Sequence, residues 1–361
     1  MSFVQKLPTK GKATSYADFW NWFQENEKPF HQAIKEGEHI EAKFFNKLHP
    51  KLAELNEGFY FLAGMMDDHT AELIVTPEGI IKNIVFTEEL IKAAPPIEGW
   101  KFTALKPSLD ISNVCIMMEG IEFSKDNLFF YPTVNTSYPD EININIVHRD
   151  YSENNKEVIN HGVLIFLDNY LGELNFVETI DNLSVSEDMN IKEELIPIEK
   201  LKAFLNWRQK EFTEKYHGIR LDTSNDAHAI LEASLENGDP LLAAINTDLL
   251  QWDCKASHPW IVIVELQFNG DTNTGMPNTE DYQKLNEIEE DIKLKDAEGY
   301  LYIGRQTTRN SREIYFACKD FRKPSKILYM AQQKYSGLFG FDYHIYKDKY
   351  WKTFKRFLPN K

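Results

Sequence analysis

Basic and hydroxyl side chains gather in one short stretch of the chain, residues 305–312, where an anion could bind. Arg305 and Thr307 are two positions apart, so in a strand both side chains point to the same face. Arg309 and Arg312 flank the turn that follows. Three guanidiniums with neighbouring hydroxyls can bind a carboxylate or a phosphate. This stretch is therefore the first candidate anion site, and with a nearby carboxylate it could serve a hydrolase.

The nearest carboxylates in the expected fold are Glu289 and Glu290, on the helix that precedes this stretch. Arg305 could pair with either of them and only stabilise the fold, because structural ion pairs are common in such places. Gly304 leaves one side of the strand bare, so that the helix or a ligand could approach closely. Of the two roles for Arg305, we expect the structural one.

One face of the C-terminal sheet is a second candidate site. Strand alternation is expected to place Glu265, Tyr302, Glu313 and Tyr315 together on an open face. RNA-binding sheets stack bases on aromatic side chains of central strands, but here the two glutamates would repel phosphate. We therefore interpret this face as a surface that packs against protein, either the hairpin at residues 229–247 or the N-terminal domain.

The chain lacks the motifs that indicate common cofactors. It has no P-loop, dinucleotide fingerprint, His-Glu-x-x-His or Gly-x-Ser-x-Gly sequence, so we expect no cofactor and no metal site. Cys115, Cys254 and Cys318 have neither metal-ligand nor disulfide spacing, and are expected to be small buried residues. Asp168 and Glu173 could act as acid and base, but a helix C-cap with surface acids is the simpler explanation.

Charge is unevenly distributed along the 361 residues, whose formal net charge is −16. Residues 299–361 carry 14 Lys and Arg against 4 Asp and Glu, whereas the preceding part is acidic. An acidic chain argues against a nucleic-acid partner, although the basic end could bind an anion or pack against the acidic body. No stretch approaches the about 20 apolar residues of a membrane span, and residues 1–6 contain no secretion signal. We therefore expect a cytoplasmic protein with a protein partner and no membrane partner, and leave its oligomeric state open.

Apolar periodicity and turn residues predict an α+β chain with two domains. The larger mixed domain, residues 1–216, is expected to contain helices at 15–35, 38–55, 87–94, 157–171 and 198–216, with strands between them that include one at 174–185. Polar residues 217–225 mark the boundary. The second domain, residues 226–361, begins with the hairpin at 229–247. It continues with strand 260–268, helix 279–294, strands 299–307 and 312–318, helix 324–335 and strand 340–346. This β-α-β-β-α-β order is the ferredoxin-like plan.

The C-terminal part also resembles a known family. The residues that carry the resemblance are Gly275-Met276-Pro277, Leu285, Ile288, Glu289 and Glu290, Gly304-Arg305-Gln306-Thr307-Thr308, Arg312-Glu313-Ile314-Tyr315-Phe316, and Lys347-Asp348 with Trp351, Phe357, Leu358 and Pro359. Together they are similar to the bacterial "domain of unknown function 695" family, and upstream segments look like the leader region that accompanies this domain. By topology the domain is also similar to the RraB-type inhibitors of ribonuclease E. The resemblance implies no activity, because the family is named for its unknown function.

Three functions follow from these observations. We predict a non-enzymatic interaction or regulatory protein whose acidic surface meets a protein partner. The first alternative is a hydrolase or other anion-binding enzyme that uses Arg305, Thr307 and Arg312 with Glu289 or Glu290. The second alternative is an RNA binder that acts through the basic C-terminal segment.

Overall fold

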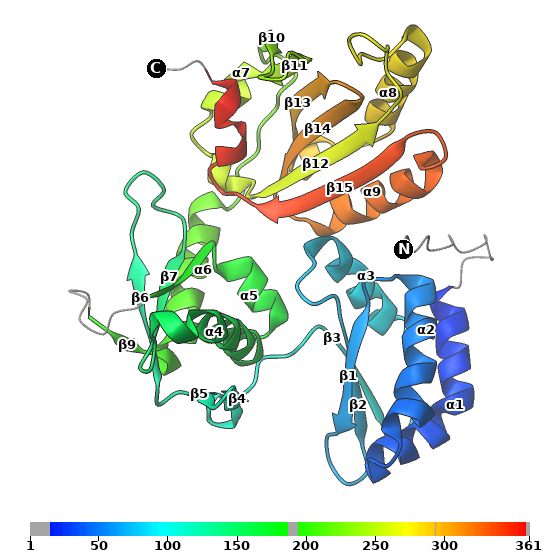
Figure 1. Cartoon of the computed structure of the whole chain (residues 1–361), viewed down its shortest axis with the longest axis vertical. Coiled ribbons are helices and arrows are strands. Elements are labelled where there is room, and N and C mark those ends of the chain that lie inside the picture. Colours follow the sequence, from blue (N-terminus) through cyan, green and yellow to red (C-terminus); the bar gives the residue numbers. More distant parts are fainter. Residues whose placement is uncertain (1–14, 187–193, 293, 359–361) are drawn as a thin grey trace. The chain divides into compact units, whose positions relative to one another are not determined.

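The computed structural model describes residues 15–186, 194–292 and 294–358, and it mixes helices with strands as predicted (Figure 1). The chain divides into two compact units. Unit 1 comprises Met1–Ser108 and Gly172–Leu174, and unit 2 comprises Leu109–Leu171 and Asn175–Lys361. This division differs from the expected one at residues 217–225, so a boundary at that stretch stays a prediction. Residues 1–6, examined above for a secretion signal, lie outside the described part.

Unit 1 is a three-stranded sheet with helices, assembled around aromatic side chains. Its elements are α1 (Tyr16–Glu36), a π-helix (Glu41–Phe45), α2 (Asn46–Leu55), β1 (Tyr60–Met65), β2 (Ala71–Thr76), α3 (Ile81–Lys92) and β3 (Trp100–Ala104). Strand β2 lies in the middle, antiparallel to β1 and parallel to β3. Ser15 caps α1 through a reciprocal pair of hydrogen bonds with Asp18, as its position before the helix predicts. Phe19, Phe23 and Phe30 of α1 are fully buried.

The first part of unit 2 is a four-stranded sheet of order β8-β7-β6-β9. Its elements are the hairpin β4 (Ile116–Met118) and β5 (Ile121–Phe123), then β6 (Leu128–Thr133), β7 (Asn143–His148), α4 (Lys156–Leu171), α5 (Glu173–Thr179), β8 (Asn182–Ser186), β9 (Ile196–Pro197) and α6 (Leu201–Tyr216). The strand predicted at 174–185 is wrong in its first half, which is helix α5. Leu174 and Val177 are three residues apart and Phe176 and Ile180 four, so they fit a helix as well as a strand.

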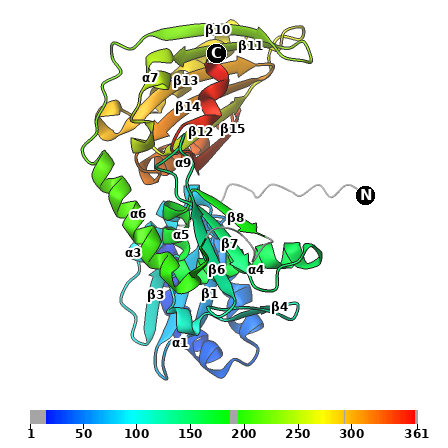
Figure 2. The same cartoon turned by 90° about the vertical axis from the view of Figure 1, so that its left-hand side faces the viewer.

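The second part of unit 2 is a six-stranded antiparallel sheet of order β10-β11-β13-β14-β12-β15. Its elements are β10 (His228–Ser234), β11 (Pro240–Asn246), α7 (Thr247–Gln251), β12 (Trp260–Gln267), α8 (Thr279–Asp291), β13 (Tyr300–Thr308), β14 (Ser311–Cys318), α9 (Arg322–Tyr335) and β15 (Gly340–Lys347). The predicted order of elements is confirmed. Val262, Val264 and Leu266 of β12 are fully buried, as expected for an interior strand. The hairpin β10-β11 extends the sheet at one edge (Figure 2).

The two faces of this sheet are covered by different elements. Helices α8 and α9 lie against one face (Figure 1). The opposite face carries Ile261, Tyr315 and Ala317, which form one apolar cluster with α7 and with a 3-10 helix at Lys352–Phe357. Buried side chains of this sheet therefore meet the two long helices on one face, and α7 or the C-terminal 3-10 helix on the other.

Candidate functional site

Arg305 lies on β13 beneath helix α8, where it forms the structural pair that we expected. Its Nη1 atom is 2.9 Å from Glu289 Oε2, and the Tyr302 hydroxyl donates a hydrogen bond to Glu289 Oε1. Burial by itself would lower the pKa of Arg305. The Glu289 carboxylate outweighs this effect and raises that pKa above its usual value. Glu290, the other candidate carboxylate, is exposed on the same helix. Glu289 is thus the partner of Arg305, and both of its oxygens are occupied.

Arg312 is enclosed beside this pair, with only 1% of its surface exposed. Its Nε atom donates to Thr307 Oγ1 at 3.1 Å, and its Nη1 atom donates to Asn286 Oδ1 at 2.9 Å. The guanidinium also lies over the ring of Tyr282, 5.1 Å from its centroid. Burial, followed by the neighbouring charge of Arg305, lowers the pKa of Arg312. Neutral groups hold this cation, since among the described residues it has no ion pair.

Arg309, the fourth predicted anion ligand, belongs to a different contact. It pairs through Nε with Asp239, in the turn of the β10-β11 hairpin, and donates through Nη2 to the carbonyl of Asn273 at 2.7 Å. The structure therefore brings Arg305, Thr307 and Arg312 together but separates Arg309 from them. The close approach expected at Gly304 is made by another strand: a Cβ there would lie 2.3 Å from the carbonyl oxygen of Ala244 on β11.

The expected open sheet face is wrong in two respects. Tyr302 points to α8 and shares the face of Arg305, because a bulge between Tyr302 and Gly304 shifts the alternation of β13. Tyr315 does lie on the face opposite to α8, but it is fully buried beneath Phe354 and Phe357. The packing partner of this face is therefore the C-terminal 3-10 helix, and the β10-β11 hairpin extends the sheet.

Glu265 and Glu313, the two glutamates expected on that face, lie on neighbouring strands and have cationic or titratable partners. Glu265 on β12 is 3.5 Å from His344, and Glu313 on β14 is 3.5 Å from Arg356. Arg356 also donates to the hydroxyl of Tyr315 at 2.8 Å. The C-terminal segment thus supplies charge as well as apolar cover to this face.

The basic end of the chain pairs with acidic residues of the four-stranded part of unit 2. Lys347 and Lys349 contact the two oxygens of Asp181 at 2.8 and 2.6 Å, and Lys352 contacts Glu141 at 2.6 Å. The side chain of Lys349 is 0% exposed. These contacts match the alternative in which the basic segment packs against the acidic body. They use cations that an RNA site would need, so the RNA alternative gains no support from them.

Burial, and then the charge of Lys347, lowers the pKa of Lys349 to about 8. The unfolded chain, with a value near 10.5, therefore binds this proton more readily between pH 8 and 10.5. Stability contributed at this site should rise as the pH increases through that window. Relative to Lys349→Met, the wild type should gain up to about 3 kcal/mol of unfolding free energy as the pH rises through this window. Urea denaturation at a series of pH values measures it. The exposed Lys210→Met variant is the control, and a pH-independent difference for Lys349→Met would contradict the assignment.

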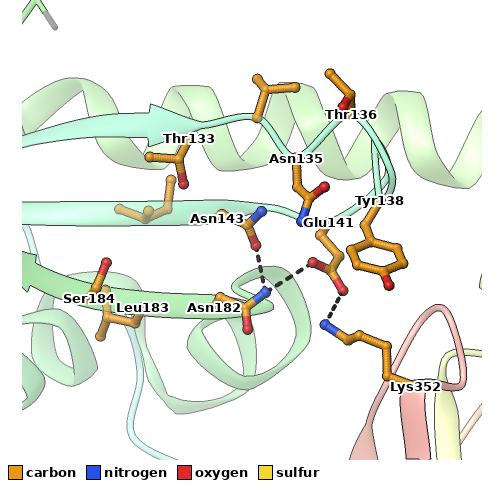
Figure 3. A pocket seen from close by; sticks show the side chains of 12 residues that line it. Thr133, Asn135, Thr136, Tyr138, Glu141, Asn143, Asn182, Leu183, Ser184 and Lys352 are labelled. Atoms are coloured by element: carbon orange, nitrogen blue, oxygen red, sulfur yellow. Dashed lines mark hydrogen bonds and ion pairs between the residues drawn. The ribbon is translucent and has the colours of Figure 1, made fainter. Parts of the chain in front are cut away.

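A polar depression of about 580 Å³ lies beside this junction and was not foreseen from the sequence (Figure 3). Asn143 and Asn182 form part of its wall, with Tyr138, Glu141 and Lys352 at one end. Asn182 Nδ2 donates to Asn143 Oδ1 at 2.6 Å and to Glu141 Oε2 at 3.2 Å. Both oxygens of Glu141 are therefore bonded, one to Asn182 and one to Lys352. The depression offers amides and hydroxyls for hydrogen bonding, and its one carboxylate is already satisfied.

Glu173 has a structural role, and the expectation of a surface acid is wrong. Only 1% of Glu173 is exposed. Within unit 1, its carboxylate accepts hydrogen bonds from the Thr76 hydroxyl at 2.6 Å, the Gly79 amide at 2.6 Å and the Lys106 amide at 3.2 Å. A carboxylate bonded to three donors ties β2 to the segments that follow β2 and β3.

Other chemical features can be stated for residues 15–186, 194–292 and 294–358. No group of three or more His, Cys, Asp or Glu side chains there could hold a metal ion. No helix in these ranges is both long and apolar enough to cross a membrane. Cys318 is buried as expected, but Cys254 is partly exposed and Cys115 is exposed.

The β10-β11 hairpin has an apolar surface that the rest of the sheet's cover does not reach. Its side toward α8 carries Ile230, which is 73% exposed, and Leu242, which is 40% exposed. Ile230 on β10 lies across from Ala244 on β11, and Ala244 lies across from Arg305 on β13. The three residues therefore share one face of the sheet, which α8 covers farther along. Two apolar side chains are thus left uncovered beside the Arg305 pair.

Comparison with known proteins finds a family to which the C-terminal sheet is similar. Residues 233–359 match the family model described as "Family of unknown function (DUF695)". The match confirms the resemblance found in the sequence and covers the chain from within β10 to its C-terminal end. No curated protein and no solved structure matches the chain. The similarity to RraB-type inhibitors stays a prediction.

Proposed function

We propose that this chain is a non-enzymatic interaction or regulatory protein, located in the cytoplasm, that works by binding another protein. The observation that supports the proposal is the uncovered β10-β11 surface, where Ile230 and Leu242 face solvent. Exposed apolar side chains that cluster on one element mark interaction sites more often than isolated ones do. The strand order β13-β14-β12-β15, with α8 and α9 as connections, also supports a ferredoxin-like plan for residues 226–361, extended by this hairpin.

Reciprocal affinity capture tests the proposal. The full-length chain is used as bait in a lysate of its native host, and each captured protein is then used as bait in turn. We expect one protein to be recovered in both directions and to bind the purified chain. Failure of every captured protein to bind the purified chain would overturn the proposed function.

The enzyme alternative is tested separately at Arg305. Because Arg305 neutralises the partly buried Glu289, we expect Arg305→Ala to lower the unfolding free energy by about 2 kcal/mol. Thermal melts of the wild type and the variant, with and without phosphate, measure the effect. The exposed Arg220→Ala variant is the control, because the Arg220 side chain donates to the neighbouring Ile219 carbonyl and forms no ion pair with a described residue. An unchanged melting temperature in buffer, together with loss of a phosphate-induced shift that the wild type shows, would instead indicate an anion site.

A further inference from the structure

Strand β10 forms one edge of the six-stranded sheet. It pairs with β11 along one side over seven residues, and on its other side the described part of the chain supplies no strand. A row of backbone N–H and C=O groups is therefore available there for pairing with another strand.

The two edges of the sheet differ in how they are protected. At the opposite edge, β15 carries Asp342 and His344 on its exposed face, each with a side chain 53% exposed. Charged side chains of this kind discourage pairing between edges. Strand β10 also carries an exposed histidine and an exposed acid, His228 and Glu232, but Ile230 between them is 73% exposed and the strand contains neither lysine nor proline. An edge of this composition favours the addition of a strand.

The charge around β10 indicates what kind of strand would pair with it. Residues 226–248 contain five acidic residues and no Lys or Arg. Asp239 pairs with Arg309, but no described residue forms an ion pair or hydrogen bond with the carboxylate of Glu232 or Glu236. Glu232 also lies across from Leu242, so the same surface is both apolar and acidic. Complementarity requires a partner that is both apolar and basic. Two copies of this hairpin would bring like charges together, which opposes self-pairing.

We propose that β10 pairs with an extended segment of a partner protein, which adds to the sheet as a seventh strand and carries apolar and basic side chains in turn along the one face that meets Ile230 and Glu232. Ile230 and Glu232 point to the same face of β10, so an apolar side chain of that segment covers Ile230 and a cation two positions along lies near Glu232. Backbone hydrogen bonds supply affinity in this mode of recognition, and the alternate side chains supply specificity. The proposal rests on the proposed function and names the class of partner that the hairpin accepts.

Amide hydrogen exchange of the full-length protein tests the proposal with a defined probe. The probe is the heptapeptide Val-Thr-Lys-Thr-Val-Thr-Lys with blocked ends, which presents valine and lysine in turn on one face of a strand, and the same peptide with glutamate in place of lysine is its control. At a probe concentration ten times the dissociation constant, exchange in residues 228–234 should slow about tenfold. The glutamate peptide should leave these residues unchanged. No slowing at millimolar concentrations of the lysine peptide, or slowing confined to other strands, would overturn the proposal.

Ile230→Lys removes the apolar contact and adds a charge at the edge, and because Ile230 is 73% exposed the fold should be retained. We expect the variant to lose the protection given by the lysine peptide. Met330→Lys on α9, where Met330 is 62% exposed, makes the same change of charge elsewhere and should behave as the wild type. Protection of residues 228–234 that rises with protein concentration alone would identify a second copy as the occupant and overturn the proposal. If a reciprocally captured partner binds the Ile230→Lys variant as well as the wild type, the proposed function stands and the β10 edge is ruled out as the binding site.

Discussion

The Asp181→Ala variant should lose about 3–5 kcal/mol of unfolding free energy. Asp181 has a side chain only 7% exposed and accepts from Lys347, from Lys349 and from the Ile142 amide at 2.7 Å. Removal of this carboxylate leaves Lys349, which is fully buried, without its counter-charge. The remaining acceptor for Lys349 is the Asp140 carbonyl at 2.8 Å, and the Asp140 carboxylate, which is paired with Lys215, acts on Lys349 without direct contact. The cost therefore comes mainly from a buried ammonium that the protein can no longer neutralise.

Chemical denaturation at pH 7 measures this loss, with the exposed Asp150→Ala as the matched control. A double variant, Asp181→Ala with Lys349→Met, removes the buried ammonium as well, so it should be more stable than Asp181→Ala alone. If Asp181→Ala were as stable as Asp150→Ala, the contacts of the basic segment would be surface pairs of little energetic importance.

Val264→Asp should abolish the folded six-stranded sheet. Val264 is fully buried on β12, paired with Ile314 on β14 and with Tyr343 on β15. An isolated carboxylate in this position has no hydrogen-bond partner and costs more than the typical stability margin of a domain allows. We expect circular dichroism to show loss of the cooperative transition of this sheet.

A milder change keeps the test informative if Val264→Asp does not yield soluble protein. Val264→Ala should lower the unfolding free energy by about 2 kcal/mol, because it leaves a cavity in the same core. Gln267→Asp, at the exposed end of the same strand, adds the same charge and should be nearly neutral. A soluble Val264→Asp variant that melts like the wild type would contradict the assignment of β12 to the interior.

Elements with strong local signals were predictable from the sequence. The capped start of α1 and the Asn237-Gly238 turn of the β10-β11 hairpin have side-chain or backbone requirements that few residues meet. Residues 174–179 were misassigned because their apolar pattern fits both periods, so tertiary packing decides between helix and strand. The face of Tyr302 was misassigned because the bulge in β13 changes the alternation at a position that has no distinctive residue apart from Gly304.

The candidate sites, too, were predictable only where local sequence patterns determine the contact. The pairing of Arg305 with Glu289 could be anticipated, because Glu289 lies on helix α8 and Arg305 lies on β13, the next strand along the chain. Asp181 and Lys349 are 168 residues apart, and no local pattern relates them. The polar wall formed by Asn143 and Asn182 was equally hidden, since adjacent strands β7 and β8 are separated in the chain by two helices. Sites of this kind arise from strand pairing, which a single sequence does not specify.

The position of Glu173 determines when unit 1 can be completed during synthesis. Unit 1 takes its strands and long helices from the first 108 residues, but the carboxylate that binds Thr76, Gly79 and Lys106 arrives 65 residues later. A nascent chain that ends at Ser108 has the three donors without their acceptor, so its sheet cannot reach full stability. Helix α4, which belongs to unit 2, is translated in this interval. The two units therefore mature in an interleaved order on the ribosome, although domains usually fold one after another as they emerge.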